Sequence, residues 1–329
     1  MTRTSRGRRV ASISALAALA GVIVAAATAA TNARVAIKTP GYPIFAVGAG
    51  GAVWVGTHHE QVVYRISPKT NRVVKTIIVG HTPCGEPVVG FGAIFFNDCL
   101  DEGDRTLELA TRSNKIVRTY AGGTPVVGYG SVWTLDTTGK SVRRFDPQTG
   151  VKIATIATGL TDENGGGEAS LGTAGAGSVW LSDQLAKTVV RIDAATNKVV
   201  AVIPLPGAAT QAAASQGYAA GGPMTFAGGK AWVGNPAGVY AVDPATNTAA
   251  LLRVKIGALN AWGDIAITSA GGSVFARTSG NTVTQIDAAS GNVVGTYPAA
   301  GGGGGIAKAF GSLWVANAAS DSVWREPLP

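Results

Sequence analysis

Motifs that hold phosphate or activate a nucleophile are missing from this sequence. The glycine run 301–305 is not followed by Lys and Ser or Thr, so it lacks the pattern of a phosphate-binding loop. No Gly-x-Ser-x-Gly segment occurs, and this excludes the nucleophile turn of the α/β-hydrolases. No segment matches a dinucleotide-binding fingerprint either. The sequence therefore argues against a nucleotide-dependent enzyme and against a serine hydrolase of that class.

Histidine, cysteine and clustered charge are also scarce. Only three His and two Cys occur in 329 residues, and no spacing such as His-x-x-x-His indicates a metal site. The formal net charge is +8, but four of these charges (Arg3, Arg6, Arg8 and Arg9) precede an apolar run, and without them +4 remains. The other Lys and Arg residues are scattered instead of forming a basic stripe. Nucleic acid is therefore not an expected partner.

The N-terminal 33 residues have the pattern of an export signal. The four arginines form a basic region, and residues 10–29 are almost wholly small and apolar. Signal peptidase could cut after Ala29 or after Ala33. An uncleaved membrane anchor is the alternative, since twenty apolar residues can span a bilayer, and both the general secretory and the twin-arginine route stay open. We expect a secreted or extracytoplasmic protein whose mature domain, residues 34–329, is a monomer with no membrane span.

One aromatic pattern recurs seven times after this segment. A Gly is followed by one or two small or apolar residues and then by Trp or Phe within a short hydrophobic run. The aromatic residues are 38 to 52 residues apart, a period typical of β-propeller blades. They are Trp54, Phe95, Trp133, Trp180, Trp232, Phe275 and Trp314. Strands such as 52–55 are apolar on both faces, as expected for blades packed between two neighbours.

A turn signature follows most of these aromatic residues. It begins with Asp or Ser, often continues with Pro, and ends with Asn or Gly, a residue that tolerates positive φ. The copies span 67–71, 146–150, 193–197, 243–247 and 287–291, with a degraded copy at 110–114. β-branched runs flank each copy, which indicates a hairpin. One blade is then an inner strand, the aromatic strand and the two strands of this hairpin.

The seventh blade lacks its fourth strand at the C-terminus. The segment 32–39 resembles the fourth strands of other blades, such as 71–77 and 197–203. We expect this N-terminal strand to complete the last blade, because an open ring would leave unpaired strand edges. The sequence thus predicts an all-β, seven-bladed β-propeller that is closed by its N-terminal strand.

Both cysteines fall in the second blade. Cys84 is predicted in the connection from blade one, and Cys99 in the loop after the aromatic strand. These two kinds of loop open on the same face of a propeller, the top face. We therefore predict a Cys84–Cys99 disulfide, which an oxidising compartment permits.

The top face also gathers the residues that are capable of chemistry. His58, His59 and His81 all map to it, with Glu86 and other carboxylates nearby in the loops. Imidazole combined with carboxylate could form a divalent metal site or an acid/base site. Turn-forming residues in solvated loops are the alternative explanation.

Acidic and aromatic residues near the predicted channel mouth are further candidates. Glu86, Glu168 and Asp264 precede inner strands and could coordinate a cation such as Mg²⁺ or Ca²⁺ on the propeller axis, or could simply cap strand ends. Trp262 lies outside the aromatic repeat. With Tyr42 and Tyr218 it could form a stacking platform for a sugar or an aromatic ligand, or it could pack on its own blade.

The repeats resemble those of a known group of proteins. The segments Gly311-Ser-Leu-Trp-Val-Ala-Asn317 and Val189–Val200 look like YVTN-type propeller repeats and are similar to repeats of streptogramin B lyases. The resemblance implies a seven-bladed propeller over residues 32–329. Streptogramin B lyases are magnesium-dependent and act by elimination on an ester of a cyclic peptide antibiotic. Their catalytic His and Glu residues come from later blades, whereas this chain has no His after His81.

Two functions remain after this comparison. The first is an exported, non-catalytic propeller that binds a protein, a peptide or a cell-envelope glycan on its top face. The second is a lyase-like, metal-dependent enzyme that uses the sector of His58, His59 and His81.

Overall fold

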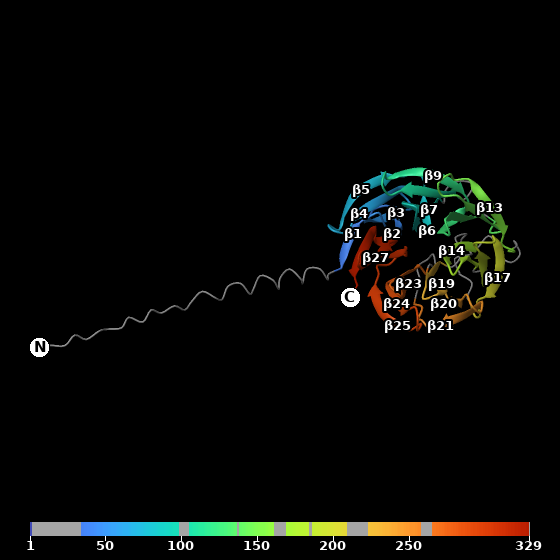
Figure 1. Ribbon diagram of the computed structural model, residues 1–329. Coiled ribbons are helices and arrows are strands. Elements are labelled where there is room, and N and C mark those ends of the chain that lie inside the picture. Colours follow the sequence, from blue (N-terminus) through green and yellow to red (C-terminus); the bar gives the residue numbers. More distant parts are fainter. Residues whose placement is uncertain are drawn as a thin grey trace. The chain divides into compact units, whose positions relative to one another are not determined.

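Seven four-stranded antiparallel sheets are arranged as blades around a central axis in the computed structural model (Figure 1). Besides Met1, the structure describes residues 34–98, 105–136, 138–160, 169–183, 186–208, 223–257 and 265–328. Residues 34–329 form one compact unit. The expected export signal, residues 1–33, lies outside the described part apart from Met1, so its cleavage stays a prediction.

Each blade runs from an inner strand at the axis to an outer strand at the rim. Blade 1 consists of β2 (Pro43–Ala49), β3 (Ala52–Thr57), β4 (Val62–Ser67) and β5 (Arg72–Ile78). Blade 2 consists of β6 (Pro83–Gly90), β7 (Ala93–Asp98), β8 (Arg105–Ala110) and β9 (Lys115–Ala121). Blade 3 consists of β10 (Gly123–Gly128), β11 (Ser131–Leu135), β12 (Ser141–Phe145) and β13 (Lys152–Ala157). Blade 4 consists of β14 (Ala169–Gly175), β15 (Ser178–Asp183), β16 (Thr188–Asp193) and β17 (Lys198–Pro204). Blade 5 consists of β18 (Met224–Ala227), β19 (Lys230–Asn235), β20 (Gly238–Asp243) and β21 (Thr248–Leu252). Blade 6 consists of β22 (Ile267–Ala270), β23 (Ser273–Ser279), β24 (Thr282–Asp287) and β25 (Val293–Pro298).

Blade 7 combines both ends of the unit. Its strands are β26 (Ile306–Ala309), β27 (Ser312–Asn317), β28 (Ser322–Pro327) and, outermost, β1 (Val35–Lys38). The register pairs Val35 with Arg325 and Lys38 with Ser322. Inner strand β2 lies against both β6 and β26, so blade 1 follows blade 7 and the ring is closed. The predicted closure by the N-terminal strand is confirmed.

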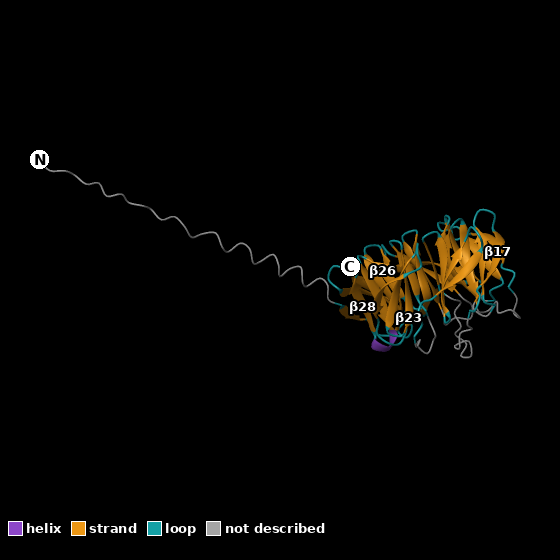
Figure 2. Cartoon of the chain, turned by 90° about the horizontal axis from the view of Figure 1, so that it is seen from below, coloured by secondary structure: helices purple, strands orange, loops and turns teal. Residues whose placement is uncertain are grey.

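The two faces of the ring differ in their connections. The top face carries the loops that follow each second strand and the connections between blades, together with the 3₁₀ turn η5 (Ala318–Ser320), at the lower edge of Figure 2. The bottom face carries the turns between the first and second strands and between the third and fourth strands. The predicted hairpin turns of this second kind are confirmed. Their last residues have positive φ, for example 54° at Asn71 and 74° at Gly150.

The repeated aromatic residues form the packing between blades. All seven side chains are at most 1% exposed. Each of the five tryptophans makes the same kind of hydrogen bond: its indole Nε1 donates to the backbone carbonyl five residues earlier, at 2.8–3.0 Å. This bond satisfies the one polar atom of a large buried side chain, and it explains why the aromatic strand tolerates Trp in a closed core.

Four arginines on third strands join neighbouring blades on the bottom face. We call Arg65, Arg144, Arg191 and Arg325 the inter-blade arginines. Each guanidinium lies over the Trp of its own blade, 4.6–5.3 Å from the ring centroid. Each also donates to the Asn that ends the turn of the next blade, over 2.8–3.2 Å. The acceptors are Asn114, Asn197, Asn247 and Asn71 in the same order.

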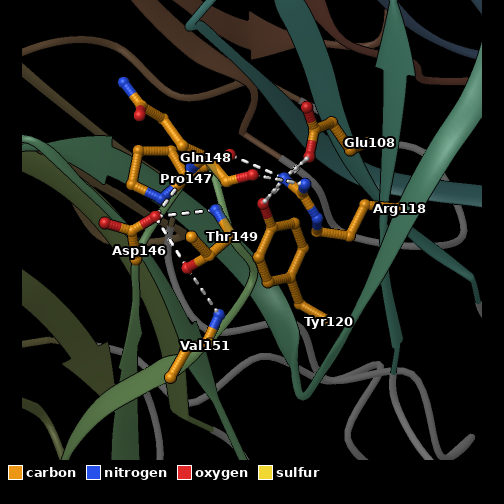
Figure 3. Close-up of polar contacts among 8 residues, drawn as sticks. All are labelled: Glu108, Arg118, Tyr120, Asp146, Pro147, Gln148, Thr149 and Val151. Carbon is orange, nitrogen blue, oxygen red and sulfur yellow. Dashed lines mark hydrogen bonds and ion pairs between the residues drawn. The ribbon is translucent and has the colours of Figure 1, made fainter.

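Blade 2 makes the same kind of link from a different strand (Figure 3). Glu108 occupies the third-strand position, and Arg118 of the fourth strand donates to the backbone oxygens of Pro147 and Gln148 in blade 3, at 2.6 and 2.7 Å. Glu108 accepts hydrogen bonds from Arg118 at 3.2 Å and from the Tyr120 hydroxyl at 2.9 Å. Burial raises the pKa of Tyr120 to about 12. Because the Glu108 carboxylate accepts a hydrogen bond from Arg118, it orients the Arg118 guanidinium toward the neighbouring turn of blade 3.

Candidate functional site

The candidate site is a sector of the top face where blades 7, 1 and 2 meet. The connection from β1 to β2 lies beside the loop after β3, because His58 N donates to Tyr42 O and His59 N donates to Gly41 O, both at 3.0 Å. Gly41 has φ of 96°, and a Cβ there would lie 2.2 Å from Glu60 Cγ. Only glycine allows this close approach.

An aromatic stack is the most ordered feature of this sector. The rings of Tyr42 and His59 are stacked with centroids 4.9 Å apart and planes inclined by 26°, and the His58 ring meets His59 edge-on at 5.5 Å. Tyr42 has φ of 64°, and its backbone N–H donates to Asp321 Oδ1 of blade 7 at 2.9 Å. The backbone therefore fixes the tyrosine that the sequence placed in a stacking platform.

His58 is the more enclosed of the two adjacent histidines. Burial lowers its pKa, and the nearby charge of His59 lowers it further, while a hydrogen bond with the Pro83 carbonyl acts in the opposite direction. Its Nδ1 is buried and has no hydrogen-bond partner. The enclosed position of His58 therefore favours its neutral form. The adjacent His59 side chain is exposed.

His81 forms a pair with a buried carboxylate. Its Nδ1 lies 2.6 Å from Oδ2 of Asp98, which is 2% exposed, and Asp98 Oδ1 accepts a hydrogen bond from Thr82 N at 3.0 Å. A carboxylate at Nδ1 keeps the proton on that nitrogen and leaves Nε2 as the acceptor. The pair can therefore orient a hydrogen bond or accept a proton from a ligand at the top face.

Two predicted site residues lie inside a strand instead of in a connection. Cys84 and Glu86 belong to β6, whose register shifts between Cys84 and Val88. Cys84 is buried and pairs with Asn97, two residues before Cys99. Cys99 lies outside the described residues, so the disulfide stays a prediction.

Glu86 is exposed and points toward blade 7. A Cβ built on Gly305 would lie 3.3 Å from Glu86 Oε2, and Gly305 N donates to Ile44 O at 2.7 Å. These contacts join the inner-strand ends of blades 7, 1 and 2. The carboxylate therefore lies where the inner strands of these blades begin, within β6 itself, and its predicted role at the channel mouth stays a prediction.

The remaining candidates cannot be placed. Glu168, Tyr218, Trp262 and Asp264 lie outside the described residues, so the axial cation site and the rest of the stacking platform stay predictions. Across the described ranges, no group of three or more His, Cys, Asp or Glu side chains is arranged to hold a metal ion. The structure adds two residues that sequence reasoning had not given these roles. Asp98 orients His81, and Asp321 joins the sector from the far end of the chain.

Comparisons with known proteins support this architecture but do not indicate an activity for the chain. The fold is similar to the crystal structure of BamB from Moraxella catarrhalis, with a TM-score of 0.55 and 13% identity over 86% of this chain and 82% of that one. At this identity the likeness shows the fold alone. No family model matches the chain, and no curated protein matches its sequence. The chain is thus a seven-bladed β-propeller, while its similarity to YVTN-type and streptogramin B lyase repeats remains a resemblance.

The alternative of an uncleaved membrane anchor concerns residues 10–29, which lie outside the described part, so it stays open. Among the helices of the described part, none is long and apolar enough to cross a bilayer.

Proposed function

We propose that this protein is an exported binding scaffold whose top-face sector recognises a protein, a peptide or a glycan of the cell envelope. The observation that carries the proposal is the stacked pair of Tyr42 and His59, held by backbone contacts to blades 1 and 7. Preorganised aromatic rings bind peptide side chains and sugar faces at little cost in conformational entropy. Export rests on the N-terminal sequence alone.

The neighbouring polar groups supply specificity for such a ligand. The Asp98-oriented imidazole of His81 offers a hydrogen-bond acceptor, and exposed Glu86 offers a carboxylate at the channel mouth. A site with one aromatic platform and a few convergent polar groups is typical of ligand recognition. A lyase-like reaction would also need a magnesium site, and no arrangement of described residues favours one.

Binding arrays test the proposal directly. Purified residues 34–329 would be applied to arrays of peptides and of envelope glycans, beside the variants Tyr42→Ala and His59→Ala. Losing a stacked ring should weaken binding by about tenfold or more. Val202→Ser, at an exposed position on the outer strand of blade 4, is the control that should bind normally. Tyr42→Ala binding as tightly as the unaltered protein would overturn the assignment.

Two further measurements test export and the competing enzyme. Mass spectrometry of protein from the culture medium or envelope fraction should find an N-terminus after Ala29 or Ala33. If the protein is a non-catalytic binding scaffold, its melting temperature should be the same with EDTA as with excess Mg²⁺ or Ca²⁺. A metal-dependent shift that His81→Ala abolishes would instead favour the metal-dependent enzyme.

A further inference from the structure

Seven equivalent turns on the bottom face join each inner strand to its second strand. Each has two residues with positive φ, the signature of a type I′ turn. The second is always Gly, with φ between 70° and 79°. The first has φ between 50° and 59°. In chain order the first residues are Gly50, Phe91, Tyr129, Ala176, Gly228, Gly271 and Phe310.

Three of these seven turns carry an aromatic residue in the left-handed conformation. Phe91, Tyr129 and Phe310 are 51%, 41% and 44% exposed, so none of them is a core residue. A side chain with a Cβ is disfavoured at such φ, and glycine fills the same position in three other blades. A large aromatic residue kept in a strained conformation while about half exposed points to a role outside the fold.

The three rings occupy one side of the bottom face. They come from blades 7 and 2, which flank blade 1, and from blade 3, which adjoins blade 2. The Phe310 ring leans over blade 1, with Cε2 3.7 Å from a Cβ built at Gly48. Val89, on the inner strand of blade 2, is a further 43% exposed. We call Val89, Phe91, Tyr129 and Phe310 the aromatic sector. Blades 4 to 6 place only Ala or Gly at the equivalent turn positions.

On the part of the bottom face formed by blades 7, 1 and 2, the exposed charge around Phe310 and Phe91 is predominantly positive. The outer turns of blades 3 to 6 open with Asp, whereas those of blades 1 and 2 open with Ser67 and Ala110. These two turns and the first residues of β5 and β9 carry exposed basic side chains, and the half-buried Lys308 lies two residues before Phe310. The exposed basic residues are Lys69, Arg72, Arg112 and Lys115. Glu326 of blade 7 is paired with Arg34.

The chain also enters the ring at this face. β1 begins at Val35, which pairs with Arg325 near the bottom end of β28, and runs toward the top face. In the sequence, the apolar run 10–29 ends only a few residues before Arg34. The folded unit therefore begins at the bottom end of blade 7.

We infer that the aromatic sector and its basic surround are a docking surface for a lipid bilayer with anionic headgroups. Aromatic side chains favour the interfacial layer of a bilayer, where the ring is buried and the rim stays hydrated. Lys and Arg beside them add attraction to anionic lipid. This surface lies opposite the top-face sector, so docking would leave that sector directed away from the membrane.

Vesicle sedimentation tests the inference. Residues 34–329 contain every strand of the ring and omit the apolar segment, so any binding comes from the folded unit. We expect binding to vesicles of phosphatidylglycerol mixed with phosphatidylcholine, weak binding to phosphatidylcholine alone, and loss of binding at high salt. The variants Phe91→Gly and Phe310→Gly should each lower the partition coefficient by about tenfold.

The glycine variants separate docking from a structural role. Because Gly adopts these φ values without strain, both variants should melt at the same temperature as the unaltered protein or higher. Ala176→Gly, at the equivalent turn of blade 4, is the matched control and should leave vesicle binding unchanged. Unchanged partitioning of Phe91→Gly and Phe310→Gly would overturn the inference, as would preference for a poly-glutamate peptide over the vesicles.

Discussion

The link between Arg144 and Asn197 gives a sharp test of how neighbouring blades are held together. Arg144 belongs to the third strand of blade 3, and Asn197 ends the outer turn of blade 4. Their side chains meet at 2.9 Å, and Arg144 also reaches the Ala194 carbonyl of the same turn at 2.7 Å. We predict that Arg144→Ala loosens the contact between these two blades without disturbing either blade.

The expected loss follows from the contacts of Arg144. Its three short hydrogen bonds, to Ser131, Ala194 and Asn197, contribute about 1 kcal/mol each at this half-buried position. The guanidinium lies 4.6 Å from the Trp133 centroid, a cation–π contact that adds about 0.5–1 kcal/mol. Ordering the arginine side chain costs about 2 kcal/mol. Arg144→Ala should therefore lower the free energy of unfolding by about 2 kcal/mol.

A double-mutant cycle with Asn197→Gly isolates the contact between blades. Glycine suits the φ of 56° at this position, so the single change should cost little beyond the lost hydrogen bond. Urea denaturation of the four proteins should give a coupling energy of about 1 kcal/mol. A coupling within the roughly 0.3–0.5 kcal/mol expected of independent sites would refute the view that the pair joins the blades.

Three further predictions concern blade closure and titrating groups. Deleting residues 34–39 removes β1 with buried Ile37 and should cost at least about 3 kcal/mol by calorimetry. Tyr120→Phe should cost about 1 kcal/mol. Because the folded-state pKa of Tyr120 is raised to about 12, its stabilisation is present below pH 10 and lost toward pH 12, and urea midpoints of the Phe variant should lack this loss. Because burial lowers the pKa of His58, the thermal midpoint should fall as pH drops from about 7 to below 6, and His58→Gln should reduce that fall.

The features of the fold that repeat along the chain were predictable from the sequence. A Trp or Phe in each apolar second strand and a turn ending in Asn or Gly are local patterns, so each copy supports the others. Closure by β1 was predictable because 32–39 resembles a fourth strand and blade 7 lacks one. Local patterns repeated seven times leave few alternative architectures.

The site was less predictable because it depends on contacts between distant segments. Asp321 and Tyr42 are separated by nearly the whole chain, and only ring closure brings them together. The placement of Glu86 and Cys84 was also misjudged, since the irregular start of β6 extends the strand into the expected connection. Irregular strand starts have no distinct sequence pattern.

One contact between blades could have been inferred from the sequence once the blades were aligned. An inter-blade arginine in one blade is accompanied by Asn at the end of the turn in the next blade. Where the third strand has Glu108 or Ala241 instead, the next turn ends in Gly150 or Gly291. The two positions therefore vary together along the chain: Asn ends the turn where an arginine of the preceding blade donates a hydrogen bond to its side-chain oxygen, and Gly ends the turn where that arginine is missing.

The same alignment predicts a stabilising substitution in blade 1. In blades 3, 4 and 7 the inter-blade arginine donates through Nε to a buried serine, at 2.8–2.9 Å. Blade 1 has Ala52 at that position, and the Nε of Arg65 is buried without a hydrogen-bond partner. Because an unsatisfied buried donor costs about 1–3 kcal/mol, Ala52→Ser should raise the free energy of unfolding by about 1 kcal/mol.

Urea denaturation of Ala52→Ser beside the reverse change in blade 3, Ser131→Ala, checks both directions of this argument. The first variant should shift the midpoint upward, and the second should shift it downward by a similar amount, since it leaves Arg144 Nε without its serine. Both positions are buried, at 3% and 1% exposure, so the two substitutions differ mainly in whether the arginine is satisfied. A neutral or destabilising Ala52→Ser would mean that the serine serves its own strand and not the arginine.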